Sequence, residues 1–464
     1  MSESFQKETH KNIDIIKGEP IRAIRKVAAP MILSMFLIMV YNLADSVWVS
    51  GLGADALAAL GFVTPLFMIV IGLGNGLGAG ANSLIARAIG GENKALANNA
   101  ALHSIVMSVI ISIVIPIILI PLLPDIINIM GGGSTMSYAL AYGNIIFGLM
   151  IVFVISSVFS AVLRSEGDVN RATIAMAITA VLNIVLDPIF IYIFGWGVAG
   201  AAWATVVSGL VSCIVMGFWM WVKRDTYMDL HFSEFNASKY VVTDILKVAI
   251  PSTFEQLIIS LLVIGINAML TITATATMVA VYTAAMRIVQ MAMIPLMGFG
   301  TALLTVAGAG YGARNYDKMK TSFSYTIKLG LVISIVLAIL IVVFAPQLAL
   351  LFSYSAETAY LTAQIEEVLR ILSLFLVFMS FGIAGSCLFQ GVGRGTTSLI
   401  ITIFRSLIGE IVFSYLLGIV FGMGYTGVFY GLILGSFCGC MFGYIWARVY
   451  LKELKKVFKN PSES

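Results

Sequence analysis

Long apolar runs, separated by short polar gaps, fill most of this chain of 464 residues. Most runs reach about 20 residues, the length at which an α-helix crosses the hydrocarbon core of a bilayer. Charged residues make up only 11% of the chain, against roughly a quarter in soluble proteins. The pattern predicts an all-α polytopic membrane protein and excludes a soluble domain.

The apolar runs divide into twelve expected membrane spans, and the longest polar interruption, residues 223–239, falls between the sixth and the seventh. We therefore expect two pseudo-symmetric six-helix lobes. Residues 1–222 would form the N-terminal lobe, 223–240 a cytoplasmic linker and 241–464 the C-terminal lobe. The expected spans are approximately 25–50, 56–88, 100–124, 137–163, 171–194, 197–222, 242–271, 275–310, 322–352, 361–390, 397–420 and 424–450.

The basic residues predict the orientation of these spans. With a cytoplasmic N-terminus, 24 of the 27 Lys and Arg residues fall in inner loops, the linker or the terminal segments. The other three, Arg287, Arg370 and Arg405, lie inside spans, so no outer loop holds a basic residue. Because cytoplasmic loops are enriched in Lys and Arg, we expect both termini in the cytoplasm.

The two halves of the sequence repeat each other. "KVAAP" at 26–30 recurs as "KVAIP" at 247–251, and "FGWGVAG" at 194–200 recurs as "FGMGYTG" at 421–427. Each copy holds an even number of spans, so both copies insert in the same orientation. Parallel repeats of this kind are typical of transporters.

Motifs of enzyme chemistry are absent from the sequence. The glycines of "GLGNGLGAG" at 72–80 follow no strand and precede no Lys-Ser/Thr pair, so they favour close helix packing over phosphate binding. None of the three histidines has metal-ligand neighbours. We expect no enzyme, no cofactor, no firm metal site and no nucleic-acid partner.

Two acids inside the N-terminal lobe are the strongest candidates for function. Asp45 and Asp187 fall in the outer half of their spans, where that lobe offers no Lys or Arg. An ionised group there costs ~2.5–3.5 kcal/mol on insertion scales, so it is normally paired, inward-facing or functional. Asn183 precedes Asp187 by one turn, and Asn42 precedes Asp45 by three residues. Amide groups can bond either protonation state of an acid or supply a carbonyl ligand to Na⁺. The alternative is two unrelated acids, each bonded locally.

The C-terminal lobe carries its own intramembrane charges. Glu255 and Glu410 lie inside spans, and Arg287 and Arg405 are available to neutralise them. A structural charge network and a second substrate or proton site both fit this set. Arg370 follows Glu366 by four residues, a spacing that predicts a local salt bridge.

Four stretches resemble the multidrug and toxic compound extrusion (MATE) transporters, and the likeness is closest to the DinF-like prokaryotic branch. They are "YNLADSVWVSGLGADALAALG" (41–61), "LRSEGDVNRA" (163–172), "LNIVLDPIFIYIFGWGVAGAAWATV" (182–206) and "QGVGRG" (390–395). The resemblance implies a twelve-helix exporter of organic cations and amphipathic drugs, driven by inward H⁺ or Na⁺. It further implies a multi-pass protein of a prokaryotic plasma membrane, which we expect to be monomeric.

The resemblance also assigns residues. Asp45, Asn183 and Asp187 match the N-lobe acids and amide that bind the coupling ion, either H⁺ or Na⁺. The branch often has another Asn in the fourth helix, where this chain has only serines, with Ser157 as a possible support. That departure favours H⁺. Glu255 matches a C-lobe Glu of the NorM-like branch.

The expected mechanism is alternating access by rocking of the two lobes. Binding of the ion would neutralise the N-lobe acids and expel a cationic drug. The alternative is a flippase for lipid-linked precursors, whose cavities usually display many basic residues; here the first half offers acids. A channel or receptor is disfavoured by the internal repeat.

Overall fold

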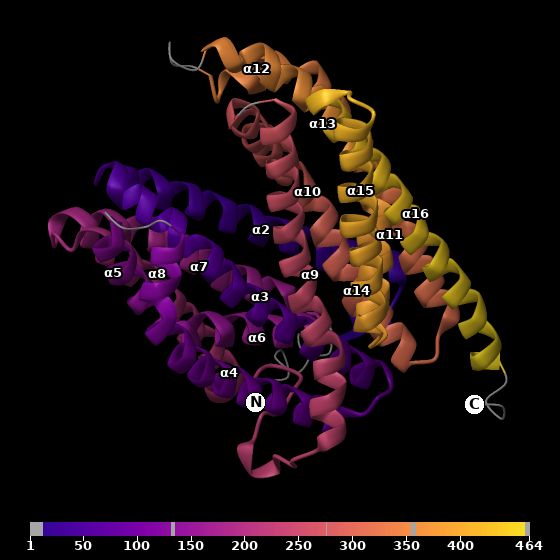
Figure 1. Ribbon diagram of the computed structural model, residues 1–464. Helices are drawn as coiled ribbons and strands as arrows, with labels where there is room; N and C mark the ends of the chain where they lie inside the picture. The colour runs from indigo at the N-terminus through magenta and orange to yellow at the C-terminus, as the bar shows by residue number, and fades with distance from the viewer. Residues whose placement is uncertain (1–12, 131–134, 275, 354–358, 460–464) are drawn as a thin grey trace. The chain divides into compact units, whose positions relative to one another are not determined.

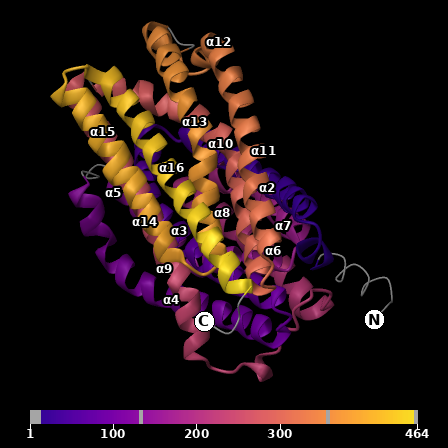
Figure 2. The same ribbon diagram turned by 90° about the vertical axis from the view of Figure 1, so that its right-hand side faces the viewer.

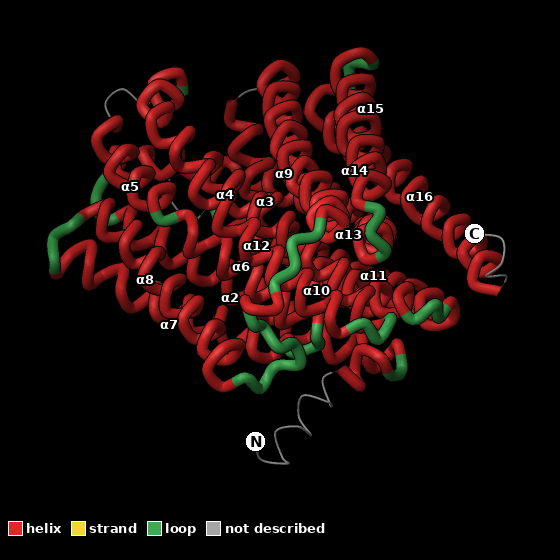
Figure 3. The backbone as a smooth tube through the Cα atoms, turned by 90° about the horizontal axis from the view of Figure 1, so that it is seen from below, coloured by secondary structure: helices red, strands yellow, loops and turns green. Residues whose placement is uncertain are grey.

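The computed structural model describes residues 13–130, 135–274, 276–353 and 359–459. Within these ranges the chain is helical and contains no strand (Figure 3). Eleven helices there are long and apolar enough to cross a membrane, and α5 with α6, which meet at a bend of 47°, make a twelfth. The predicted all-α, twelve-span fold is therefore confirmed, although the expected span at 137–163 is broken at Leu149.

The helices group into two compact units, of which the first holds Ala29–Thr253 and the segment that ends at Gly18. Its elements are α2 (Pro20–Ser50, from Ala29 onward), α3 (Ala54–Gly90), α4 (Lys94–Ile129), α5 (Met136–Gly148), α6 (Met150–Ser165), α7 (Val169–Pro188), the π-helix η2 (Ile189–Ile193), α8 (Gly197–Gly217), the π-helix η3 (Phe218–Lys223), the 3₁₀-helix η4 (Phe232–Glu234) and the first part of α9 (Lys239–Thr273). Within this unit α3 packs on α6, and α7 packs on α8 (Figure 1).

The second unit holds Glu19–Ala28 and the chain from Phe254 onward, so the division between the units falls inside α9. The assignment of lobes to residues 1–222 and 241–464 stays a prediction. The elements of the second unit are the rest of α9, α10 (Ala276–Gly312), α11 (Tyr316–Val343), α12 (Ala345–Leu350), the 3₁₀-helix η5 (Ala359–Leu361), α13 (Thr362–Gly391), α14 (Gly395–Ile403), the π-helix η6 (Phe404–Ile411), α15 (Val412–Tyr415), the π-helix η7 (Leu416–Val420) and α16 (Gly424–Lys459).

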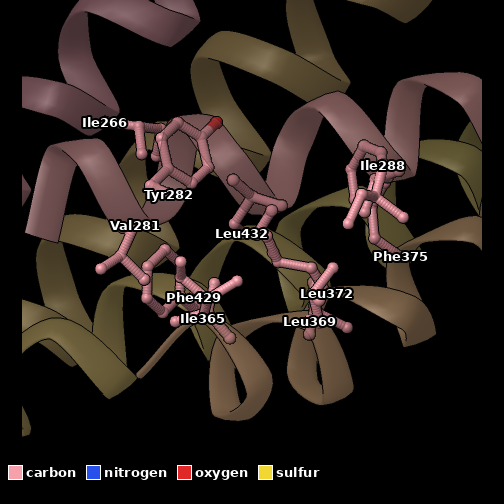
Figure 4. Close-up of a cluster of buried hydrophobic side chains, with 14 of the residues drawn as sticks. Ile266, Val281, Tyr282, Ile288, Ile365, Leu369, Leu372, Phe375, Phe429 and Leu432 are labelled. Atoms are coloured by element: carbon pink, nitrogen blue, oxygen red, sulfur yellow. The ribbon is translucent and has the colours of Figure 1, made fainter. Parts of the chain in front are cut away.

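Apolar packing gives the second unit its own core, drawn in Figure 4. Side chains from α9, α10, α13 and α16 meet there, and the rings of Tyr282 and Phe429 stack with centroids 5.9 Å apart. Leu372 and Leu369 of α13 are fully buried in the same cluster. This core fixes the helices that carry the polar residues of the unit.

The sequence repeat is matched by equivalent backbone turns in each unit. Asn93 caps α4 by accepting a bond from the backbone N–H of Leu96, and Asn315 caps α11 in the same way, each at 2.9 Å. The residues before them, Glu92 and Arg314, both adopt a left-handed conformation, with φ of 59° and 50°. Equal sequence patterns therefore produce equal local structure.

A glycine stripe on α16 shapes the second unit. It consists of the five glycines at positions 427, 431, 435, 439 and 443, one at every fourth residue. A Cβ atom on Gly435 would overlap the backbone of Gly409, and one on Gly431 would overlap that of Phe413. Small residues at this spacing allow helix backbones to touch. The span from α14 to η7 therefore lies directly against α16.

Candidate functional site

The first polar cluster is centred on α7. Asn183 and Asp187 lie one turn apart on the same face of that helix, and both are buried, with 1% and 0% of the residue exposed. The side-chain amide of Asn183 donates to Asp187 Oδ1 at 3.4 Å and to Thr205 Oγ1 of α8 at 3.3 Å. The amide thus links the carboxylate of α7 to the hydroxyl of α8.

Asp45, on α2 of the same unit, belongs to this cluster. Its carboxylate lies within electrostatic range of Asp187, and Tyr142 of α5 lies within range of both. Tyr41, one turn before Asp45, is also within its range. No ion pair in the described part of the chain involves either acid. The two predicted carboxylates therefore influence each other electrostatically, and the described residues give neither of them an ion-pair partner.

Three oxygens of this cluster are buried without a hydrogen-bond partner: Asp45 Oδ1, Asn183 Oδ1 and Asp187 Oδ2. Buried polar atoms are nearly always hydrogen-bonded in proteins. Such a concentration of orphaned oxygens suits a proton, or a cation that prefers oxygen ligands. Among the described residues no group of three or more His, Cys, Asp or Glu side chains could hold a metal ion.

The hydrogen bonds of two predicted supporting residues go to groups other than the carboxylates. Asn42 is exposed, and its backbone carbonyl accepts a bond from Ser46. The hydroxyl of Ser157 donates to Asn75 Oδ1 of α3 at 3.0 Å. Ser157 therefore joins α6 to α3 and contacts neither acid in this arrangement.

The sequence analysis missed Tyr41, Tyr142 and Thr205. Thr205 had a weak signal, because it is one of only three hydroxyl-bearing residues of α8, together with Ser208 and Ser212. The tyrosines had none, since the chain holds 17 of them and most sit in apolar runs. Only the packing of α2 and α5 in space brings Tyr41 and Tyr142 within electrostatic range of the acids.

Glu255 forms a separate polar contact in the second unit. Its Oε2 accepts a bond from the Gln390 side chain of α13 at 3.2 Å, and the same nitrogen lies 3.2 Å from Ser398 Oγ. Glu255 Oε1 is buried without a partner. Gln390 opens the "QGVGRG" stretch, so the motif noted in the sequence supplies the partner of this acid.

Glu410 and Arg405 meet because η6 is a π-helix. Residues five apart point to different sides of an α-helix, whereas the wider π-helical turn brings them to the same side. Arg405 Nε lies 3.6 Å from Glu410 Oε1, and the two side chains are 12% and 1% exposed. Neither Glu410 oxygen accepts a well-formed hydrogen bond, although the hydroxyls of Ser406 and Ser436 are near.

The other two arginines take different places. Arg287 is exposed and pairs with no acid in the described part of the chain, so Arg405 alone of the two candidates contacts an intramembrane acid. The predicted local pair between Glu366 and Arg370 is confirmed, with a distance of 2.7 Å.

Comparison with known proteins gives one consistent answer. The MatE family model matches residues 30–189 and 251–416. A crystal structure of a MATE protein in complex with MaL6 superposes with a TM-score of 0.94 at 39% identity, covering 96% of this chain and 99% of that one. Among curated proteins, the probable multidrug resistance protein YoeA of Bacillus subtilis is 27% identical over 73% of this chain and 75% of its own length. The FAD transporter of Shewanella oneidensis is 27% identical over 72% and 74%.

The membrane-spanning helical fold and the family match define a membrane transporter, and transporters of this kind are not enzymes. The chain belongs to the multidrug and toxic compound extrusion (MATE) family. The family predicted from the four sequence stretches is thereby confirmed, as is the prediction that the chain is no enzyme.

Proposed function

We propose that this protein is a secondary active multidrug efflux transporter of a prokaryotic cell membrane, which exchanges cationic or amphipathic drugs for H⁺ or Na⁺. One observation carries the proposal: Asp45 and Asp187 lie within electrostatic range of each other, and no ion pair among the described residues involves either acid. Two ionised carboxylates in a low-dielectric site repel each other, so the pair is more stable when it binds one positive charge than when both acids are ionised and nothing is bound. The same pair can therefore alternate between a small cation and a cationic drug.

The coupling mechanism follows from this competition. A proton that enters from outside neutralises one acid and removes the repulsion between Asp45 and Asp187. The loss of negative charge weakens the hold on a cationic drug, and α2 repacks as the lobes rock. Reciprocity requires that drug binding weaken ion binding by the same factor.

The choice between H⁺ and Na⁺ turns on the number of oxygen ligands. Asp45, Asn183 and Asp187 each offer one orphaned oxygen. A sodium site would gain from a further oxygen ligand on α6, but the Ser157 hydroxyl there is directed to Asn75 of α3, and it has no hydrogen bond to either acid. This favours H⁺ as the coupling ion.

Three properties of the assembly are part of the proposal. Both termini are cytoplasmic, as the distribution of basic residues predicts. Residues 1–222 and 241–464 act as the two lobes, joined by the linker 223–240. The protein works as a monomer with no cofactor other than the coupling ion.

A second candidate, export of an anionic flavin nucleotide, is favoured by the relative from Shewanella oneidensis that is named FAD transporter. The acids of the first unit oppose this cargo, because Asp45 and Asp187 repel phosphate groups. FAD therefore serves as the competing cargo in the test below.

The test uses proteoliposomes loaded with a fluorescent organic cation, whose efflux is measured. A proton gradient and a sodium gradient are imposed separately. We expect the proton gradient to drive efflux, and Asp45→Asn or Asp187→Asn to reduce it about tenfold or more. The control is Asp125→Asn, which removes an exposed acid of α4 in the same unit and should leave efflux unchanged. Undiminished efflux by both site variants, or transport of FAD in place of the cation, contradicts the proposal.

A further inference from the structure

A basic pocket lies between α11 and α16 of the second unit, near the first residues of α11 and the last turns of α16. These two helices pack against each other (Figure 2). The pocket has a volume of about 120 Å³. It is lined by Tyr316, Lys320, Phe323, Ser324, Arg448, Leu451 and Lys452. Three of these side chains are cationic and none is acidic.

Among the described residues, the cations of the pocket form no ion pair with an acid. These cations are Lys320, Arg448 and Lys452, and all three are exposed. Two aromatic rings at the pocket contact basic side chains, one of them the lining residue Arg448. Arg448 Nη1 donates to the Tyr444 hydroxyl at 3.0 Å, and the Lys455 ammonium lies 5.5 Å from the centre of the Tyr316 ring.

The spacing along α11 concentrates the pocket on one helical face. Tyr316, Lys320 and Ser324 follow one another at four-residue intervals, and the exposed Lys328 comes next. Lysine ammonium, arginine guanidinium and a serine hydroxyl are all donors to phosphate oxygens. The chemistry that fits this arrangement is a phosphate group of one or two negative charges.

The same face continues as exposed apolar surface. On α11, Val332 and Ile335 lie one and two turns beyond Lys328 on its side of the helix, and they are 58% and 40% exposed. On α16, Ile445 lies one turn from Arg448 and is 58% exposed. A ligand that fills the pocket can therefore lay a hydrocarbon tail along the neighbouring helix surface. A soluble phosphate ester has no hydrocarbon tail to place on that surface.

We propose that this pocket binds the headgroup of an anionic phospholipid, with its acyl chains against the apolar face of α11. Basic pockets between membrane helices are known to accept such headgroups. The site lies at the basic start of α11 and the basic last turns of α16, the helix ends that we expect at the level of the cytoplasmic headgroups. It is separate from the carboxylate cluster, because all its residues belong to the second unit.

The test measures retained lipid by native mass spectrometry of the full-length protein, after incubation in mixed phosphatidylglycerol and phosphatidylcholine. The variant Lys320→Gln/Lys452→Gln removes two cations and leaves the packing of Arg448 in place. Each basic residue contributes about fivefold to the affinity for an anionic headgroup, so we expect roughly 25-fold weaker retention of phosphatidylglycerol. Retention of phosphatidylcholine should not change.

Two matched variants complete the experiment. Lys239→Gln/Lys247→Gln removes the same charge from exposed positions of α9 and should retain phosphatidylglycerol like the wild type. Lys320→Arg/Lys452→Arg keeps the charge and should also retain it. Equal loss in the α9 control, or unchanged retention in the pocket variant, overturns the proposal. So does displacement of the lipid by glycerol 3-phosphate as readily as by short-chain phosphatidylglycerol, because the tail would then contribute nothing.

Discussion

Removal of the Glu410 charge should strongly destabilise the second unit. Glu410 and Arg405 form a buried pair with a separation of 3.6 Å and side-chain exposures of 1% and 12%. Arginine cannot release its proton, so Glu410→Gln leaves a charge buried without compensation. Breaking one partner of such a pair costs ~3–5 kcal/mol. For a domain of about 200 residues this lowers Tm by roughly 6–20 °C.

The opposite substitution should behave differently. In Arg405→Met the remaining acid can take up a proton, so the loss of stability is smaller and grows as the pH rises. The double variant Arg405→Met/Glu410→Met places two thioethers in a pocket that already holds Met379 Sδ and Cys440. Replacement of a buried ion pair by apolar groups is often neutral or stabilising, so we expect its Tm within a few degrees of the wild type.

Thermal unfolding in detergent, followed by tryptophan fluorescence across a pH series, measures these differences. The control is Glu366→Gln, which breaks the partly exposed pair with Arg370, 31% and 49% exposed, and should cost at most ~0.5 kcal/mol. If Glu410→Gln lowers Tm no more than Glu366→Gln does, the pair is not ionised and the reasoning fails. Drug efflux by Arg405→Met/Glu410→Met tests the role of the pair. Efflux is kept if the pair is only structural, and it is lost if the pair is a transport site.

Two further predictions concern packing and pH. Gly435→Ala would place a methyl group on the backbone of Gly409, and such overpacking typically lowers stability by ~1–3 kcal/mol. The control Gly61→Ala, whose added methyl group meets nothing within 4 Å, should be neutral or stabilising. Equal Tm values for the two variants would contradict the geometry. Burial raises the pKa of Glu166, outside the spans, to about 8, although the N–H groups of Tyr227 and Met228 donate to it and oppose the rise. Because the unfolded carboxyl ionises near its ordinary pKa of 4.5, stability should fall as the pH rises from about 4.5 to about 8. Glu166→Gln should flatten that part of the Tm–pH curve, and an unchanged slope would refute the assignment.

The number of spans and the family were predictable from sequence because each depends on local features. Twenty-residue apolar runs fix the helices, and the "LNIVLDPIF" stretch carries both the acid and the amide of α7. The partners of those residues were not predictable. Tyr142 approaches Asp45 only through the packing of α5 against the rest of its unit, and no pattern in the sequence encodes that approach.

Which arginine pairs with Glu410 could also not be predicted from the sequence. Arg287 and Arg405 were equal candidates, and the five-residue interval from Arg405 to Glu410 argues against contact in an ordinary helix. The π-helical turn of η6 reverses that argument. Such turns arise from tertiary packing, and the glycines that permit it, such as Gly409 and Gly435, look in sequence like any other small residues.

The glycine stripe of α16 has a mechanical consequence. Its members face residues 417, 413, 409, 405 and 401 in turn, and at Gly427, Gly431 and Gly435 the contact is with main-chain atoms of the facing helix. Where main chain rests on main chain there is no layer of side chains to change rotamer, and sliding would drive carbonyl groups into one another. The two helices must therefore move together as one rigid body. Any flexing within this unit has to be taken up at other helix junctions, with the buried ion pair carried along unchanged.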